Sequence, residues 1–553
     1  MSSEQSTTTT VSRRSALSLG LSLAAAGALS SCSSRNTPTS GGTGESVPWP
    51  TYVKPPIFDG AVVSEEPGVP IGYAHLPKTL AKSVDDVPGR GSTIRHFQVT
   101  WSPPATPFDR NPWWQGLNER MNIKFEVTEV PASNYDAKFA TTIAGGDLPE
   151  VIQLLNTAGS IRAAKQGAFA DLTEILSADN ILKYKNLANV RTDQWKAIAI
   201  NGRIYGVPID IPSELLEYRY RKDWAENLGF PKDPADADEM AAMLTAMTKG
   251  KPEGAQQTWG VTAFPGHIDG IARAMFQVPN EWCYADGKLV NAIETPQFEA
   301  SLEWLANLWK AGAFHPDALA LEGQTDRYRA FVTQGQVGIA ADSAQNFYNV
   351  SAPYKKAVDE SRGGLVAFIP PGHDGKVKAT FLRSSGAYGM NAISAEVAKD
   401  QDRLDEILRC FNYRRAPFAT QEWYYQRFGA PGDYFDRNAE GDPVPIANRN
   451  LGADVGSIGY GLNPQAWLFP NVKECVANNE IMVQQAVADP TQGLQSDTRD
   501  TKQAQLGQLA ETYINQIVVG SRPASDLGVY RDAWRSRGGD AIRAELEQQL
   551  TGR

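Results

Sequence analysis

The alternation of apolar and polar residues predicts an α/β fold after residue 90. Ile94–Thr100 and Ile123–Val130 have the pattern of strands, and a helix with one apolar face is expected between them over Asn111–Met121. A second helix over Ala137–Ala144 ends at paired glycines, and Pro149–Leu155 then has the composition of a short buried strand. Strands that alternate with helices are typical of a mainly parallel sheet.

Predicted helices dominate the later part of the chain. A helix is expected over Gly167–Leu176. Apolar residues recur at helical spacing over Phe298–Trp309, after a Thr–Pro pair of the kind that begins helices, and again over Leu404–Phe411 and Ala541–Leu550. This helical spacing predicts that Trp304 and Trp309 pack in the core.

The amino-terminal residues have the pattern of an export signal. Arg13 and Arg14 precede a short apolar run, Ala16–Leu29, which is followed by Ser30-Ser31-Cys32. The paired arginines resemble a Tat signal, and Leu29-Ser30-Ser31-Cys32 resembles a bacterial lipobox. This resemblance implies that residues 1–31 are removed and that Cys32 carries a lipid anchor. An ordinary signal with an incidental cysteine is the alternative.

Two aperiodic segments follow the signal. Residues 32–48 are mostly Ser, Thr, Gly and Pro, which bury too little apolar surface to offset the entropy of ordering. They predict a flexible tether that spans roughly 20 to 25 Å. Residues 49–90 are rich in proline and predict an extended lead on the surface of the folded region.

Length, charge and cysteine count narrow the class of protein. Roughly 500 residues remain after the signal, which is more than one hydrophobic core usually supports, so two lobes are expected. A net charge of -10 without a Lys/Arg cluster argues against a nucleic-acid partner. Cys283, Cys410 and Cys475 lack zinc-site spacing and are predicted to be buried free thiols, although one disulfide stays possible.

The sequence contains no recognisable catalytic or cofactor motif. None of the five histidines has metal-ligand spacing, and nucleophile-elbow, Walker and dinucleotide-binding motifs are absent. The acidic residues over Asp233–Glu239 fit a helix start better than a calcium loop. We therefore predict a protein that is not an enzyme and needs no cofactor or metal, while a glycosidase-type carboxylate pair stays open.

Short motifs in a fixed order carry a family resemblance. They are Tyr135–Phe139, Ala144–Val151, Gly167–Leu172, Asn201–Pro208 and Arg221–Trp224, with further matches at Asp286–Val290, Gly335–Gly338 and Gly538–Ile542. The series resembles family 1 of the extracellular solute-binding proteins of ABC importers, which includes maltose-binding protein, and in particular its large lipoprotein subgroup. The likeness spans roughly residues 94–550, nearly the whole chain after the signal.

The resemblance implies two α/β lobes around a ligand cleft, in a periplasmic-binding-protein-like fold. Three crossovers are expected, near residues 205–212, 387–391 and 428–431. The amino-terminal lobe would comprise residues 91–212 and 391–432, and the carboxyl-terminal lobe residues 213–390 and 433–553. The implied function is capture of an oligosaccharide by a monomer anchored on the outer face of the cytoplasmic membrane, and its delivery to ABC permease subunits.

Sugar binding requires aromatic platforms together with hydrogen-bonding side chains. The expected ligand-binding residues are Trp101, Asn156, Glu214, Tyr218, Arg221, Trp282, Asp342 and Trp467. Glu214 is included because of the family resemblance, since it matches a glutamate that faces the cleft in the maltose-binding relatives. The alternative for the three tryptophans is packing in the core. The alternative for Asp342 is a role in a turn or helix cap, and that for Arg221 is an ion pair within one lobe.

One departure from the lipoprotein subgroup concerns calcium. Relatives often carry a calcium loop after the helix that follows the Arg-Lys-Asp-Trp motif, but here Lys249–Gln257 has two lysines and too few carboxylates. We expect no calcium there. The competing functions are a surface glycosidase or lyase, and a sugar-binding adhesin or sensor that does not transport.

Overall fold

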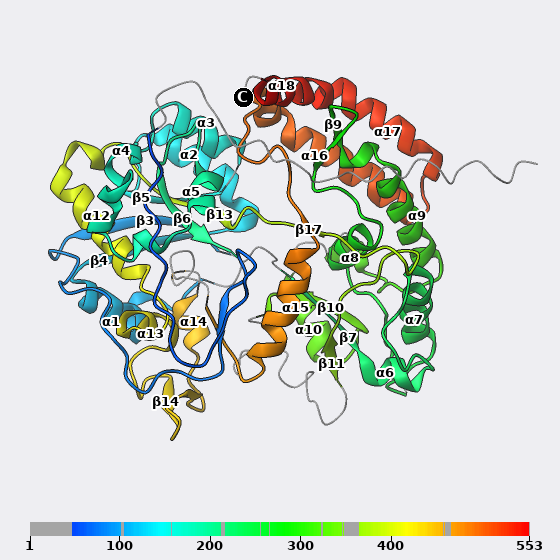
Figure 1. Cartoon of the computed structure of the whole chain (residues 1–553), viewed down its shortest axis with the longest axis horizontal. Helices are drawn as coiled ribbons and strands as arrows, with labels where there is room; N and C mark the ends of the chain where they lie inside the picture. Colours follow the sequence, from blue (N-terminus) through cyan, green and yellow to red (C-terminus); the bar gives the residue numbers. More distant parts are fainter. Residues whose placement is uncertain are drawn as a thin grey trace, which may run out of the picture.

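The chain folds into two lobes that lie side by side in the computed structural model (Figure 1). The structure describes residues 47–100, 104–155, 157–211, 216–254, 256–264, 266–321, 325–344, 347, 364–456, 458 and 466–551. The predicted signal, lipobox and most of the tether lie outside these residues. So do three of the expected ligand-binding residues, Trp101, Asn156 and Glu214.

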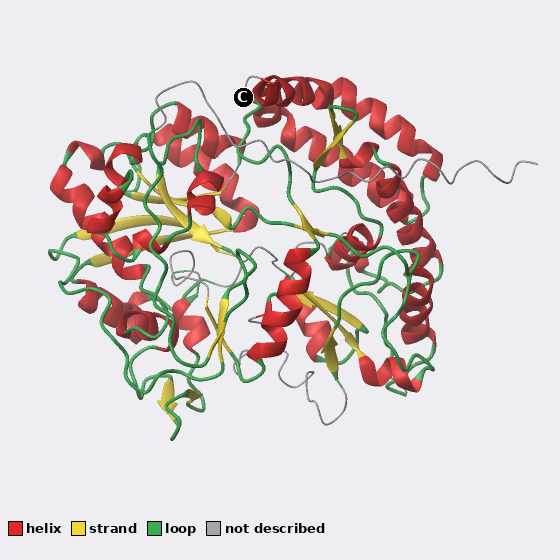
Figure 2. Cartoon of the chain, viewed as in Figure 1, coloured by secondary structure: helices red, strands yellow, loops and turns green. Residues whose placement is uncertain are grey.

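A five-stranded sheet forms the centre of the amino-terminal lobe (Figure 2). Its strands, in spatial order, are β4 (Lys124–Pro131), β3 (Thr93–Thr100), β5 (Val151–Leu155), β13 (Ala387–Ile393) and β6 (Gly206–Asp210). Strand β3 is parallel to β4 and β5, whereas β13 is antiparallel to β5 and β6. The predicted α/β fold is therefore confirmed, although antiparallel β13 interrupts the parallel pairing of the sheet.

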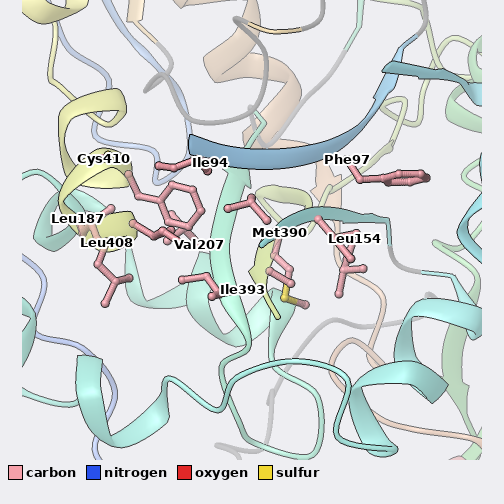
Figure 3. Packing of buried hydrophobic residues seen from close by; sticks show 14 of the residues in the cluster. Ile94, Phe97, Leu154, Leu187, Val207, Met390, Ile393, Leu408 and Cys410 are labelled. Atoms are coloured by element: carbon pink, nitrogen blue, oxygen red, sulfur yellow. The ribbon is translucent and has the colours of Figure 1, made fainter. Parts of the chain in front are cut away.

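Helices cover both faces of this sheet. They are α1 (Pro112–Met121), α2 (Tyr135–Gly145), α3 (Ala158–Lys165), α4 (Thr173–Leu176), α5 (Thr192–Ile198), α12 (Gln401–Arg414) and α13 (Gln421–Phe428). Ile94 lies near Cys410 of α12 on one face, while Phe97, Leu154 and Met390 share the opposite face (Figure 3). Because successive side chains of a strand point to opposite faces of the sheet, apolar residues pack against helices on both faces.

The carboxyl-terminal lobe has a smaller sheet and more helices. Its sheet has the order β10 (Ile339–Asp342), β7 (Glu217–Arg221) and β11 (Leu365–Ala367), and two further pairs are β8 (Trp282–Ala285) with β9 (Lys288–Asn291) and β12 (Phe381–Leu382) with β17 (Ala486–Val487). The helices are α6 (Lys222–Asn227), α7 (Ala237–Lys249), α8 (His267–Met275), α9 (Pro296–Lys310), α10 (Thr325–Thr333), α15 (Val472–Gln484), α16 (Asp497–Val518), α17 (Leu527–Trp534) and α18 (Asp540–Thr551). None of the described helices is both long and apolar enough to span a bilayer.

Local sequence signals explain several helix ends. The Asn111 side chain accepts from the Trp114 backbone N–H and caps α1, and Thr295 caps α9 just before Pro296. Gly146 ends α2 in the left-handed region at φ 76°. The predicted helix over Gly167–Leu176 is wrong in most of its length, because α3 ends at Lys165, residues 168–172 are not helical and Phe169 forms a β-bridge with Ser394, and only Thr173–Leu176 form a helix, α4.

The first two crossovers lie near their predicted places. The chain leaves β6 at Asp210 and enters β7 at Glu217, and it returns between Leu382 of β12 and Ala387 of β13. All of β13 belongs to the amino-terminal sheet, so the second crossover precedes residue 387.

The third crossover was predicted wrongly near residues 428–431. After α13 the chain forms the hairpin β14 (Phe435–Arg437) and β15 (Pro443–Pro445) and helix α14 (Leu451–Val455), which stay with the amino-terminal lobe. Phe435 packs edge-on against Phe428 with ring centroids 5.2 Å apart, and Ile458 is fully buried in the same core. The chain therefore stays with the amino-terminal lobe through Ile458, beyond the predicted 432/433 boundary, and has joined the carboxyl-terminal core by Met482 of α15.

The proline-rich lead is part of the fold, contrary to the prediction that it lies on the surface. Its strands β1 (Ala61–Val62) and β2 (Ile71–Tyr73) form a three-stranded sheet with β16 (Ala466–Leu468), and Tyr73 and Leu76 are buried. The cysteine prediction is confirmed, since Cys283, Cys410 and Cys475 are free and buried.

Candidate functional site

The candidate site lies where the amino-terminal sheet meets the first two crossovers. Strands β3, β5 and β6 end at the same edge of that sheet, and antiparallel β13 begins there. Open α/β sheets bind ligands outside the carboxyl ends of their strands. Trp101 and Asn156 directly follow the last residues of β3 and β5, and Glu214 lies in the first crossover, so these three stay predictions for this edge.

A buried polar cluster joins the two crossovers on the amino-terminal side. The Asp210 carboxylate lies 2.9 Å from a guanidinium nitrogen of Arg415, whose side chain is 1% exposed. Gln194 Nε2 donates to Asp210 Oδ1 at 2.8 Å and to the Gly386 carbonyl oxygen at 3.0 Å. We call Gln194, Asp210, Gly386 and Arg415 the crossover cluster. The sequence reasoning missed it, although a lone aspartate within an apolar strand was the available signal.

Two ion pairs lie at the matching edge of the carboxyl-terminal sheet. Glu217, the first residue of β7, accepts from Arg219 Nε at 2.9 Å and Nη2 at 2.6 Å. Asp342, the last residue of β10, lies opposite Glu217 in the strand register and accepts from Arg329 Nε at 2.9 Å. The predicted Asp342 is thus beside the first crossover, within an ion pair that sequence reasoning did not foresee.

Aromatic and imidazole groups surround the second of these pairs. His267, at the start of α8, contacts the Tyr328 ring at 4.3 Å. Burial lowers the pKa of His267 to about 4, although the nearby Asp342 charge acts in the opposite direction. The Tyr328 hydroxyl accepts the Ala341 backbone N–H at 2.7 Å. The imidazole is therefore neutral at physiological pH, and it can accept or donate a hydrogen bond without adding charge.

The next two predicted residues have structural surroundings. Tyr218 is buried in the carboxyl-terminal core, with its ring 6.3 Å from that of Phe381. Arg221 pairs with Asp223 and with Glu253, and its guanidinium lies 4.3 Å from the centroid of the Trp224 ring. Burial opposes its charge, but the hydrogen bonds that the guanidinium donates to both carboxylates outweigh that effect and raise the pKa of Arg221. The ion pair within one lobe is therefore the arrangement that the structure shows for Arg221.

The structure also places Trp282 and Trp467 among packed side chains. Trp282 is 3% exposed, and its ring centroid lies 5.9 Å from that of Trp534 in α17. Trp467 is 2% exposed and packs in a cluster with Phe469 and α15. Neither indole has a face open to a sugar, so the core alternative describes both residues in this structure.

The Lys249–Gln257 loop, which corresponds to the calcium loop of relatives, uses the Glu253 carboxylate to bind neighbouring side chains. Glu253 Oε1 accepts from Arg221 at 2.7 Å and from Trp224 Nε1 at 2.7 Å. Among the described residues, no group of three or more His, Cys, Asp or Glu side chains is placed to hold a metal ion. Glu253 therefore holds the loop through an ion pair with Arg221, whereas a bound calcium ion would need several free oxygen ligands.

Chelation of metal ions is expected to leave the stability of the protein unchanged. Because Glu253 is already held by Arg221 and Trp224, we expect that the Lys249–Gln257 loop holds no structural cation for EDTA to remove. Differential scanning calorimetry with EDTA and with added calcium checks this expectation. A calcium-dependent rise of several degrees in the melting temperature would contradict it.

Comparison with known proteins identifies relatives of this architecture. Residues 115–403 match the family described as bacterial extracellular solute-binding protein. The lipoprotein LipO of Bacillus subtilis (strain 168) is 24% identical over 478 residues, which cover 83% of this chain and 92% of LipO. The alginate-binding protein AlgQ2 superposes with a TM-score of 0.62 at 15% identity, over 83% of this chain and 98% of its own. FusA of S. pneumoniae, solved with kestose, gives 0.59 at 16% identity, over 82% and 98%.

Proposed function

We propose that the protein captures an oligosaccharide outside the cytoplasm and delivers it to an ABC importer, because the chain belongs to the bacterial extracellular solute-binding proteins. The observation that carries the proposal is the pair of sheet edges that the first crossover connects. Asp210 ends the amino-terminal strand there, and Glu217 and Asp342 lie at the edge of the carboxyl-terminal sheet. A ligand bound between these edges contacts both lobes and favours their closed arrangement.

The charged pairs suit a ligand that is rich in hydroxyl groups. Arg329 donates to Asp342 through Nε and Nη2, and carboxylates and guanidiniums are the side-chain groups that form strong hydrogen bonds with sugar hydroxyls. Ion pairing also fixes the side chains before the ligand arrives, which lowers the entropy lost on binding. Trp101, Asn156 and Glu214 complete the proposed site at the edge of the amino-terminal sheet.

Charge balance favours a neutral sugar. Among the described residues, three guanidiniums near these edges are each paired with a carboxylate: Arg415 with Asp210, Arg219 with Glu217, and Arg329 with Asp342. A bound uronate would place a further negative charge beside these carboxylates and would need a cation of its own. We therefore propose a neutral oligosaccharide, the ligand class of kestose in FusA, in preference to an acidic one such as alginate.

Thermal-shift and calorimetric screens of the purified protein test this function. Neutral fructo-, malto- and xylo-oligosaccharides are compared with oligogalacturonates of matched length. A neutral ligand at one hundred times its Kd is expected to stabilise the native state by about 2.7 kcal/mol. Binding of oligogalacturonates alone, weakened by salt, would contradict the neutral class. Release of reducing ends from polysaccharide would instead show an enzyme.

A lipid anchor at Cys32 completes the proposed placement on the membrane. Cys32→Ala is expected to release the protein from the membrane fraction, because no other acyl chain would then hold it at the bilayer. Fractionation with an antibody checks the release, and the circular dichroism spectrum of the released protein should match that of the wild-type domain. A Cys32→Ala protein that stays firmly on the membrane would show that the anchor lies elsewhere.

A further inference from the structure

Both ends of the proline-rich lead are attached to the amino-terminal lobe. Near its start, the Thr51 backbone N–H donates to the Ala178 carbonyl oxygen at 3.0 Å. Near its end, the Ser83 backbone N–H and hydroxyl donate to Glu422 Oε2, both at 3.0 Å. Residues 58–76 lie between these attachments in the sequence, and we call this segment the strap.

One side of the strap packs on the amino-terminal lobe. The Tyr73 ring stacks on Phe418 with centroids 3.9 Å apart and an interplanar angle of 8°. Trp423 belongs to the same buried cluster. The Leu76 backbone N–H donates to Asp442 Oδ1 at 2.8 Å, which ties the strap to the β14–β15 hairpin region of this lobe.

The other side of the strap packs on α15. Strand β2 is parallel to β16, with Gly72 opposite Trp467. Gly72 lies so close to α15 that a Cβ atom there would come within 2.2 Å of Val472 Cγ2 and 2.9 Å of Val476 Cγ2. Helix α15 belongs to the carboxyl-terminal lobe, because Met482 near its end is buried in that core.

The strap therefore lies between α13 and α15, beside the chain's third passage between the lobes. Figure 1 shows the blue lead next to the orange α15 in the middle of the molecule. The Arg383 guanidinium also donates to the Pro67 carbonyl oxygen at 3.3 Å, next to the second crossover. Relative motion of the lobes must accommodate these contacts in addition to the three crossovers.

We propose that residues 58–76 are a strap that limits how far the two lobes open. The packing of Gly72 on α15 and of Tyr73 on Phe418 keeps the strap attached to both lobes in the unliganded protein. Opening beyond a small angle would separate one of these apolar surfaces and expose it to water, which opposes the motion. A protein held partly closed has more of the binding-competent state before ligand arrives.

Distance measurements between spin labels test the strap without any ligand. Thr141→Cys in α2 and Glu511→Cys in α16 place labels on exposed positions of the two lobes, while the described native cysteines are buried. Gly72→Val and Tyr73→Ala each weaken one side of the strap. Both are expected to shift the distribution of distances between the lobes to longer values and to broaden it.

The matched control is Gly528→Ala in α17, where an added Cβ meets nothing within 4 Å. Its distance distribution should equal that of the labelled parent. Melting temperature and near-ultraviolet circular dichroism identify variants that keep their fold. Distributions that stay unchanged in folded Gly72→Val and folded Tyr73→Ala would overturn the proposal.

A disulfide provides a second test that needs no loss of packing. A Cβ at residue 72 would lie 3.5 Å from Val472 Cβ, which is within the range found in disulfides. In a Cys475→Ala background, oxidised Gly72→Cys/Val472→Cys is expected to form the bridge and to keep the distance distribution of its reduced form. A shift to shorter distances on oxidation would show that the strap leaves α15 in the open protein, and would overturn the proposal.

Discussion

Asp210→Ala is expected to lower the free energy of unfolding of the amino-terminal lobe by about 3 to 5 kcal/mol, because it leaves the buried Arg415 charge without its carboxylate. Arg415 is 1% exposed, so water cannot replace the lost partner. The change also removes an acceptor of Gln194, whose amide spans the first two crossovers. Calorimetry of the unliganded protein should show a clearly lowered first transition.

Two further variants separate the charge effect from packing. Asp210→Asn keeps the shape and a hydrogen-bond acceptor but not the charge, and it should be destabilised because Arg415 stays charged. The double variant Asp210→Ala/Arg415→Met removes the stranded charge and should recover part of the lost stability. If Arg415→Met lowers the stability of Asp210→Ala by as much as it lowers the stability of the parent, the two residues do not interact, and the ion pair is not the source of the effect.

Local sequence patterns predicted the first half of the amino-terminal lobe because its contacts are local. The β3, α1, β4, α2 and β5 elements follow one another, and each is bounded by a cap, glycine or proline that acts within a few residues. The same reasoning failed at residues 167–172, which are not helical and pair with the end of β13 through Phe169 and Ala170. An apolar run of this length fits a strand or a helix equally well, and tertiary contacts decide.

The third crossover and the lead could not be located from local patterns. Phe428–Pro431 has the glycine and proline of a hinge, yet Phe435 turns back onto Phe428 and retains the chain in the amino-terminal lobe. Strand β2 has only three residues and takes its place through β16, almost four hundred residues later in the sequence. Interactions over such separations leave no periodicity in either segment.

The candidate site was predictable in its position more than in its residues. Parallel strands directed attention to one sheet edge, where the structure places Asp210, and Asp342, expected at the end of a strand, is the last residue of β10. The partners of these carboxylates were not predictable, since Arg415 lies 205 positions after Asp210 and no pattern links them. The roles of the tryptophans were the least predictable. A tryptophan at the end of a predicted strand gives the same sequence pattern whether its indole faces the ligand or the core.

Trp282→Ala is expected to lower the stability of the unliganded protein by about 3 to 5 kcal/mol, as for other buried tryptophans. Trp282 packs against Trp534, and the Arg543 guanidinium lies 5.9 Å from its ring centroid, so truncation opens a cavity among three elements of the carboxyl-terminal lobe. Calorimetry should show a markedly lower melting temperature. Ligand affinity, measured below that temperature, should stay close to that of the parent.

Trp101→Ala should have the opposite pattern, since Trp101 stays our proposed platform at the end of β3. Loss of a stacking surface is expected to weaken oligosaccharide binding several-fold, with about 0.5 to 1.5 kcal/mol from ring geometry in addition to the lost area, and to change the unliganded melting temperature little. The two variants control each other, because both remove an indole from the same protein. If Trp282→Ala binds weakly but melts normally, Trp282 faces the ligand, and the packing seen against Trp534 is not maintained in solution.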